Sequence, residues 1–216
     1  MKKALIVLMI LTLMTVFVFA NRIDTKGRDF FGSGANMESY IMAARQSPDT
    51  DIKCYAIRQL GKLNHPKASE VLLECLTAGV RDVVANTSQN FEGVWMVRKE
   101  AARALGNYTI ERDRIIIALR QAMMEDPSVV VQGEAALAMA TIGSRAPEET
   151  KIRVVDYLKL KVTNTNKTRT QVLIPLVRAF GVNGHNSARN FLIYMRTTGY
   201  STLVNREIAQ AMRKLR

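Results

Sequence analysis

The chain has 216 residues, of which 48% are apolar and 23% are charged, so it can form one domain of ordinary size. This composition excludes a disordered polymer, a collagen-like chain and a small disulfide-dense scaffold. With 5 prolines and 12 glycines, the chain has few turn residues for an all-β sandwich. The formal net charge of +12 favours an acidic partner surface.

Residues 1–20 have the pattern of a secretory signal peptide. Lys2 and Lys3 precede an uncharged, mostly apolar stretch from Ala4 to Ala20. The stretch ends in Val18-Phe19-Ala20, whose compact first and third side chains are typical of a signal-peptidase site, here after Ala20. The stretch is also long enough to serve as an uncleaved membrane anchor. In both alternatives the positively charged N-terminus stays on the cytoplasmic side of the membrane, and the rest of the chain lies on the other side. We therefore expect an exported, periplasmic or extracytoplasmic protein, tethered to the inner membrane if the leader is uncleaved.

A flexible spacer is predicted for residues 21–36, between the leader and the body of the protein. The segment is polar and glycine-rich, and such segments behave as linkers. Its Phe30 and Phe31 could dock on the body or stay loosely ordered. The body is predicted to comprise residues 37–216.

A ten-residue pattern recurs along this body. Its clearest copy, Val97–Gly106, reads Val-Arg-x-x-Ala-Ala-x-Ala-Leu-Gly, and further copies begin at Ile52, Val131, Val172 and Val204. The apolar positions fall on one side of a helix, and a second apolar segment follows the copies. The average spacing of about 38 residues is typical of two-helix solenoid repeats. The pattern predicts an all-α stack of about four to five such repeats.

These copies resemble HEAT repeats of the phycobilisome-lyase-like type, whose usual pattern runs Asp-Pro-x-Val-Arg-x-x-Ala-Ala-x-Ala-Leu-Gly. Val97–Gly106 fits its part of this pattern fully. Asp126 and Pro127 supply the opening pair of the next copy, although Gln132 replaces the usual arginine. The resemblance covers residues 48–216 and implies a right-handed α-α superhelix that binds proteins or other large surfaces. It implies no reaction.

Basic side chains recur on the second helices at spacings that return to one helix face. Second helices usually line the concave side of such a stack, so we predict a basic binding strip there. The alternative is that these long cations only cover solvent-exposed surface. By contrast, we expect Arg98 to brace neighbouring turns rather than to contact a ligand. The predicted strip consists of Arg112, Arg120, Arg153, Tyr157, Lys161, Arg189 and Arg196.

Charge is distributed unevenly along the chain. Residues 151–216 hold 13 lysines and arginines against two acids, whereas residues 21–150 hold 16 against 17. A surface that serves only solubility usually mixes the two signs. The change from a nearly neutral to a strongly basic segment therefore indicates an anionic partner at the C-terminal end, either a protein with an acidic surface or an anionic membrane surface. Export argues against nucleic acid.

The sequence offers little for catalysis or metal binding. Cys54 and Cys75 fall on the two helices of one repeat, where they could form a disulfide in an oxidising compartment or remain buried thiols. His65 and His185 lack histidine or glutamate partners at helical spacing, and no nucleophile elbow, phosphate loop or dinucleotide motif occurs. We predict no catalytic residue, no metal site and no cofactor.

Together these features predict an exported, non-catalytic scaffold or adaptor. It would bind a protein or an anionic surface through its concave face and its basic C-terminal repeats. One alternative is a lyase-like or DNA-repair-like HEAT enzyme or enzyme partner, which would need a pocket with convergent polar groups. Another is a structural subunit of an envelope assembly, which would self-associate.

Overall fold

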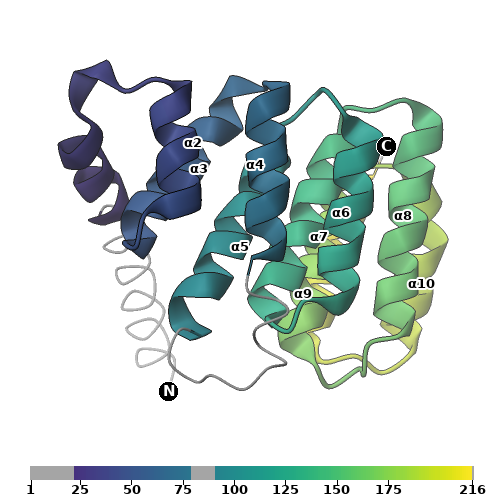
Figure 1. The fold of residues 1–216 in the computed structure, drawn as a ribbon. Coiled ribbons are helices and arrows are strands. Elements are labelled where there is room, and N and C mark those ends of the chain that lie inside the picture. The colour runs from purple at the N-terminus through teal and green to yellow at the C-terminus, as the bar shows by residue number, and fades with distance from the viewer. Residues whose placement is uncertain (1–21, 79–90, 216) are drawn as a thin grey trace.

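The computed structural model describes residues 22–78 and 91–215, and this part of the chain contains helices and no strands (Figure 1). The predicted leader, and most of the long insertion that separates the first two copies of the repeat pattern, lie outside the described residues. No helix of the described part is long and apolar enough to cross a membrane. After a helix at residues 22–31, the elements are η1 (Gly32–Gly34), α2 (Met37–Gln46), α3 (Thr50–Leu63), α4 (Pro66–Thr77), α5 (Phe91–Leu105), α6 (Arg112–Glu125), α7 (Val129–Ser144), α8 (Glu148–Thr163), α9 (Thr170–Asn183), η2 (Asn186–Ala188), α10 (Arg189–Thr197) and α11 (Thr202–Met212).

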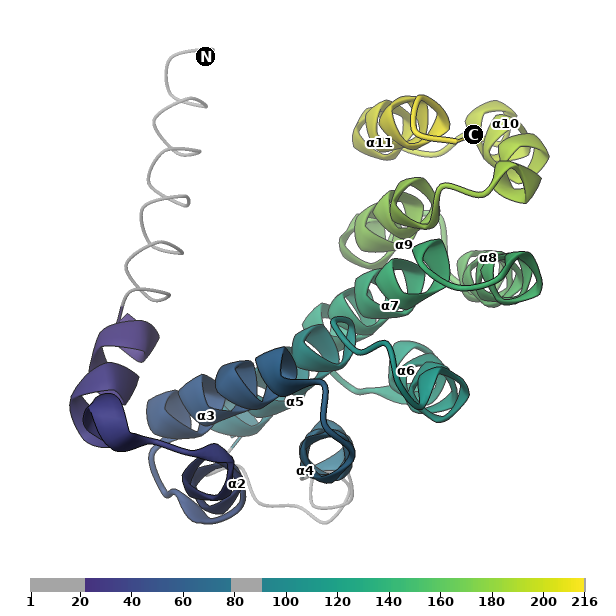
Figure 2. The same cartoon turned by 90° about the horizontal axis from the view of Figure 1, so that it is seen from above.

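The helices α2 to α11 stack in two rows. An inner row contains α3, α5, α7, α9 and α11, and an outer row contains α2, α4, α6, α8 and α10 (Figure 2). Each outer helix packs against the inner helix that follows it, and consecutive inner helices pack against each other. The predicted fold class, an all-α solenoid of helix pairs, is confirmed.

The concave side of the curved stack is lined by the inner row (Figure 2). All copies of the repeat pattern lie on inner helices, so the second helices form the convex side. The expectation that second helices line the concave side is therefore wrong. Each repeat consists of an outer helix followed by the inner helix that carries the pattern.

Small residues explain this curvature. A Cβ atom built on Gly61 of α3 would lie 2.7 Å from the Cβ of Ala104 on α5, and one on Gly106 would lie 3.0 Å from the Cβ of Ala138 on α7. Only glycine permits such a close approach of two helix backbones. Inner helices therefore pack closer together than outer helices do, and the stack bends toward the inner row.

A single core fills the space between the two rows. The ninth position of each of the first four pattern copies carries a large side chain that is completely buried, namely Leu60, Leu105, Met139 and Phe180. Outer helices complete this core with residues such as Leu72, Leu119 and Leu158. Because each repeat buries its apolar face only against its neighbours, stability is shared along the stack.

Arg98 braces the turns between repeats, as the sequence predicts. Its side chain is only 2% exposed. Its Nε and Nη2 atoms donate to the carboxylate of Asp126 at 2.8 and 3.1 Å, and Nη1 donates to the carbonyl of Ala78 at 3.1 Å. In the next repeat, Gln132 occupies the equivalent position and donates to the carbonyl of Asp126 at 2.6 Å. Its Oε1 atom is buried and has no partner in the described structure.

Residues 22–31 form a helix that packs on the body, which differs from the predicted spacer. Ile23, Gly27 and Phe31 recur every four residues and therefore share one helix face. Ile23 is only 5% exposed, and the ring of Phe31 stacks on that of Tyr55 with centroids 5.7 Å apart. A Cβ on Gly27 would lie 2.1 Å from the Tyr55 ring, so this glycine permits a close contact rather than flexibility.

Candidate functional site

A ladder of ion pairs runs along the concave face between consecutive inner helices. Arg58 of α3 pairs with Glu100 of α5, with Nε and Oε2 3.0 Å apart. Arg103 of α5 pairs in the same way with Glu134 of α7 at 2.9 Å. In each pair, the seventh residue of one pattern copy reaches the fourth residue of the next copy.

The ladder is interrupted between α7 and α9 and then resumes. Arg178 of α9 pairs with Glu207 of α11, with Nη2 and Oε1 2.8 Å apart. At the α7–α9 step, the two ladder positions are occupied by Leu137 and Pro175. Pro175 packs against α7, because a Cβ on Gly133 would lie 2.8 Å from its Cγ atom. An apolar gap therefore replaces an ion pair in the middle of the concave face.

Further apolar side chains extend this gap along the inner helices. Val130 lies seven residues before Leu137 on α7, and residues seven apart share a helix face. Val130 is 44% exposed, and Leu203 at the corresponding position of α11 is 55% exposed. Ile174 and Val182 of α9 are half-buried. We call Val130, Leu137, Pro175, Val182 and Leu203 the apolar gap.

Electrostatics hold the ladder glutamates in their charged form. Burial alone would favour the neutral carboxyl of Glu100, but the hydrogen bond from Arg58 and the charges of Arg103 and Lys99 hold its pKa below the ordinary value. The hydrogen bond from Arg178 does the same for the pKa of Glu207. Glu100 and Glu207 are therefore held in the ionised form at neutral pH, whereas the apolar gap carries no charge.

The predicted basic strip lies on the convex side of the stack, on α6, α8 and α10. Several of its members bind within the protein. Arg153 pairs with Asp113 of α6, the guanidinium of Arg120 lies 4.7 Å from the centre of the Tyr157 ring, and Lys161 donates to the carbonyl of Met124 at 3.2 Å. Burial and the charge of Arg169 lower the pKa of Lys161. These contacts all join α6 to α8.

The remaining members of the strip lie nearer the surface. Arg112 is half-buried at the start of α6, and Arg196 is exposed at the end of α10. The Nε atom of Arg189 donates to Asn186 at 2.7 Å in the turn before α10. The strip thus consists of contacts between α6 and α8 and of separate surface cations, and its role in binding stays a prediction.

Both cysteines are buried free thiols. Burial raises the pKa of Cys54 to about 12 and that of Cys75 to about 11. The Cys75 thiol lies 3.9 Å from the carbonyl of Ala44 on α2, whereas the charge of Glu100 on α5 acts on Cys54. The two thiols therefore have different neighbouring helices.

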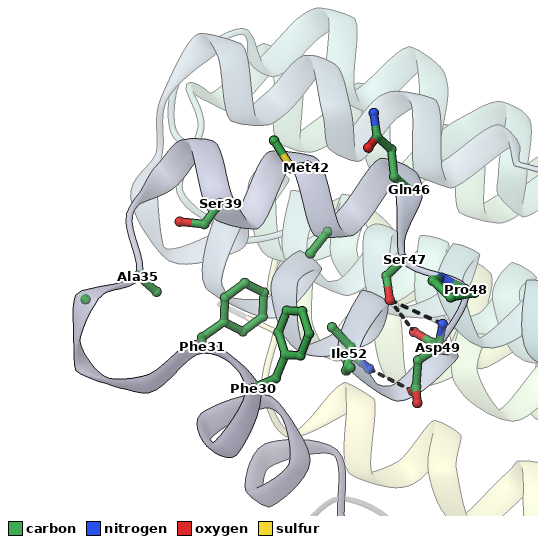
Figure 3. A pocket seen from close by; sticks show the side chains of 12 residues that line it. Phe30, Phe31, Ala35, Ser39, Met42, Gln46, Ser47, Pro48, Asp49 and Ile52 are labelled. Atoms are coloured by element: carbon green, nitrogen blue, oxygen red, sulfur yellow. Dashed lines mark hydrogen bonds between the residues drawn. The ribbon is translucent and has the colours of Figure 1, made fainter.

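An apolar pocket of about 580 Å³ lies between the N-terminal helix and α2 (Figure 3). Phe30 and Phe31 form one side, Met42 of α2 lies above them in the view, and Ile52 of α3 lies beside Phe30. Asp49 lies at the rim, where its carboxylate accepts hydrogen bonds from the first backbone N–H groups of α3. The pocket has no convergent set of catalytic side chains, and the described residues include no cluster of histidine, cysteine and carboxylate side chains that could hold a metal.

A second pocket, of about 640 Å³, lies where α7, α9 and α11 end and α8 begins. Its side chains are mainly polar and include Lys151, His185, Arg213 and Lys214. His185 has no metal-binding or catalytic partner at helical spacing in the sequence. Its neighbours come from distant parts of the chain, so no local motif marks the pocket.

Comparison with known proteins supports the repeat assignment. The family model described as PBS lyase HEAT-like repeat matches residues 52–78, which span most of α3 and α4. The fold is a HEAT-like helical solenoid. A solved structure described as an engineered protein and structural-genomics target aligns with 83% of this chain and 96% of its own, at 19% identity and a TM-score of 0.42. No curated protein matches the sequence.

Proposed function

We propose that this solenoid is an exported, non-catalytic scaffold that binds a protein with an acidic surface through its concave face. The observation that carries the proposal is the apolar gap, a stretch of uncharged surface between two ion-paired steps of the same face. Exposed apolar surface bordered by charge is the usual composition of a protein-binding site. The partner's side chains would replace water over the gap.

The charge around the gap favours an acidic partner. Of the carboxylates in residues 151–215, Asp156 pairs with Lys159 at 3.0 Å and Glu207 pairs with Arg178. Arg206, the one basic residue of α11, is exposed, as are Arg213 and Lys214 directly after the helix, and these three cations outnumber the two acids. An acidic surface would be attracted over a longer range than apolar contacts reach, and salt would weaken that attraction.

The test compares two double variants of equal chemistry. Val130→Glu with Leu203→Glu places two negative charges on the concave face, and Ile117→Glu with Ile193→Glu places two on exposed positions of outer helices. Each protein is used as bait in envelope extracts at low and high salt. We expect the concave variant to capture at least about tenfold less of an acidic partner whose binding is sensitive to salt. The outer variant should capture as much of it as the unchanged chain does.

Specific results would contradict the proposal. If both double variants capture the same proteins as the unchanged chain, the concave face is not the binding surface. If capture is indifferent to salt, the partner is not recruited by charge. Circular dichroism of both variants provides the control for folding, because all four positions are exposed.

A second candidate function is binding to an anionic membrane through the convex face. Exposed apolar side chains on the outer helices favour it, since Ile117 is 61%, Ile193 46% and Tyr194 61% exposed. Exposed cations such as Arg196 lie on the same helices. Apolar and cationic side chains together favour adsorption to anionic lipid. In sedimentation with phosphatidylglycerol vesicles, the outer double variant would then lose binding and the concave variant would keep it.

A further inference from the structure

The polar pocket at the ends of α7, α9 and α11 borders the apolar gap at Val182 but is otherwise lined by different residues. Its volume is about 640 Å³, enough for a small ligand. Residues 181–184 line one part of it, and the charged side chains come from the first turn of α8 and from the two residues that directly follow α11. The charged side chains and the imidazole that line it are those of Glu148, Lys151, His185, Arg213 and Lys214.

The single carboxylate of the pocket is already engaged. Glu148 lies 3.6 Å from the Nζ atom of Lys151 and accepts a hydrogen bond from Nε2 of His185. The other ring nitrogen of His185, Nδ1, accepts a hydrogen bond from the backbone N–H of Ser187 at 3.1 Å, so Nε2 carries the ring proton and donates the hydrogen bond to Glu148. Glu148 therefore compensates Lys151 and orients His185.

Arg213 and Lys214 enter the pocket without a carboxylate partner in the described part of the chain. The stem of Lys214 lies along the pocket wall, because a Cβ on Gly181 would lie 3.4 Å from its Cδ atom. Glycine at this position leaves room for the lysine stem. With three cations and one carboxylate, the lining carries a net charge of +2 when His185 is neutral.

We propose that this pocket binds a phosphate-type oxyanion, either inorganic phosphate or the phosphate monoester group of a small molecule. A phosphate dianion matches the net charge of the lining. It also offers three oxygen atoms, so the guanidinium of Arg213 can bind two of them while the ammonium groups of Lys151 and Lys214 contact the group from other sides. A carboxylate carries a single negative charge and would neutralise only half of the net charge of the lining.

In the first test, sodium phosphate replaces sodium chloride stepwise in a solution of the full chain, so that the ionic strength stays constant. Two-dimensional NMR records the backbone amide signals at each step. We expect the signals of residues 182–185 to shift and saturate with a dissociation constant on the order of 1 mM. Glycerol 3-phosphate serves as the second probe. Tighter binding of this ester identifies a monoester site, and equal or weaker binding identifies an inorganic phosphate site.

A matched pair of double variants separates the site from general attraction. Arg213→Gln with Lys214→Gln removes two charges from the pocket, and Arg196→Gln with Arg206→Gln removes two charges elsewhere. The pocket variant should bind phosphate at least about tenfold more weakly, and the control should stay within about twofold. Equal weakening in both variants, or absence of saturable shifts in the unchanged chain, would overturn the proposal.

The variant Glu148→Gln should gain affinity for phosphate, and a misfolded protein would not show such a gain. The glutamine can still accept the hydrogen bond of His185 but no longer competes for Lys151, so phosphate should bind about three- to tenfold more tightly. Glu149→Gln is the matched control, since Glu149 lies in the same helical turn but outside the pocket lining. Unchanged or weaker binding in Glu148→Gln would show that the carboxylate does not share a site with the anion.

Discussion

The solenoid has a front half, formed by the helices before α7, and a back half, formed by the helices after it, and residues of α7 take part in both. The two halves pack their helices in the same way but differ in the arrangement of their charges. In the front half, Asp24, Arg58, Glu100, Arg103 and Glu134 form one connected network across the concave face. In the back half, the same face holds the apolar gap, one further ladder pair and cations that outnumber the acids. The concave face of the front half is thus crossed by a connected network of ion pairs, whereas that of the back half has one separate ladder pair.

Helix packing does not account for this difference. A Cβ on Gly61 in the front half would lie 3.0 Å from the Cα of Ala104, and one on Gly181 in the back half would lie 3.0 Å from the Cα of Ala211. Measured to the backbone of the neighbouring helix, the inner helices therefore approach each other equally closely at these two positions. Since the back half packs as closely with fewer ion pairs, the ladder is not what holds the stack together there.

The largest expected effect comes from breaking the buried brace of the front half. Arg98→Met leaves the carboxylate of Asp126 buried without its partner, so the free energy of unfolding should fall by about 3–5 kcal/mol. Arg45→Met is the control, because Arg45 pairs with Glu74 at 2.8 Å on the exposed surface, where an ion pair adds little to stability, so its loss should be much smaller. Urea denaturation followed by circular dichroism measures both. Equal losses would mean that Arg98 braces no more than a surface pair does.

The next effect tests the equal packing of the two halves. Gly61→Ala and Gly181→Ala each force two inner helices apart and should lower the free energy of unfolding by about 1–2 kcal/mol, even after the gain in helix propensity. Gly34→Ala is the control, because a Cβ there meets no atom within 4 Å. A large loss in only one of the two halves would show that their inner rows pack differently.

Most of the fold follows from the sequence, because the repeat is local. The alternation of apolar and small residues within Val97–Gly106 defines an amphipathic helix, and its recurrence defines a stack. The inner position of these helices does not follow from one copy, since it depends on the contact between Gly61 and Ala104 of different repeats. The N-terminal helix was missed because Gly27 indicates flexibility in isolation and only contacts Tyr55 in the folded chain.

The concave site was predictable only in part. The ladder has a local signal, since Glu100 and Arg103 are three residues apart in one copy, and Arg178 and Glu207 occupy the same positions in later copies. Recognising it requires the knowledge that consecutive copies lie side by side. The basic strip was predicted from spacing alone. Its outer location and its contacts, such as Arg120 with Tyr157, depend on which row forms the convex side.

A smaller effect concerns acid stability of the ladder. The pKa of Glu100 in the folded chain is lowered, so its contribution is present above the pKa of the unfolded chain, about 4.3, and is lost as pH falls through the folded value. The free energy of unfolding should therefore decrease between about pH 5 and 3, and Glu100→Gln should flatten that decrease. Urea denaturation at a series of pH values measures it. An unchanged slope in the variant would show that Glu100 does not contribute to the acid sensitivity.

The smallest effect separates contacts between outer helices from free cations. Arg120→Gln removes the cation–π contact with Tyr157 and should lower the free energy of unfolding by about 0.5–1 kcal/mol. Arg196→Gln, on an exposed residue of α10, should change it by less than about 0.3 kcal/mol. Partner capture should be the same for both variants, because the convex strip is not the proposed binding face. If Arg120→Gln leaves stability unchanged but abolishes capture, Arg120 acts on a partner rather than on Tyr157, and the binding surface lies on the outer row.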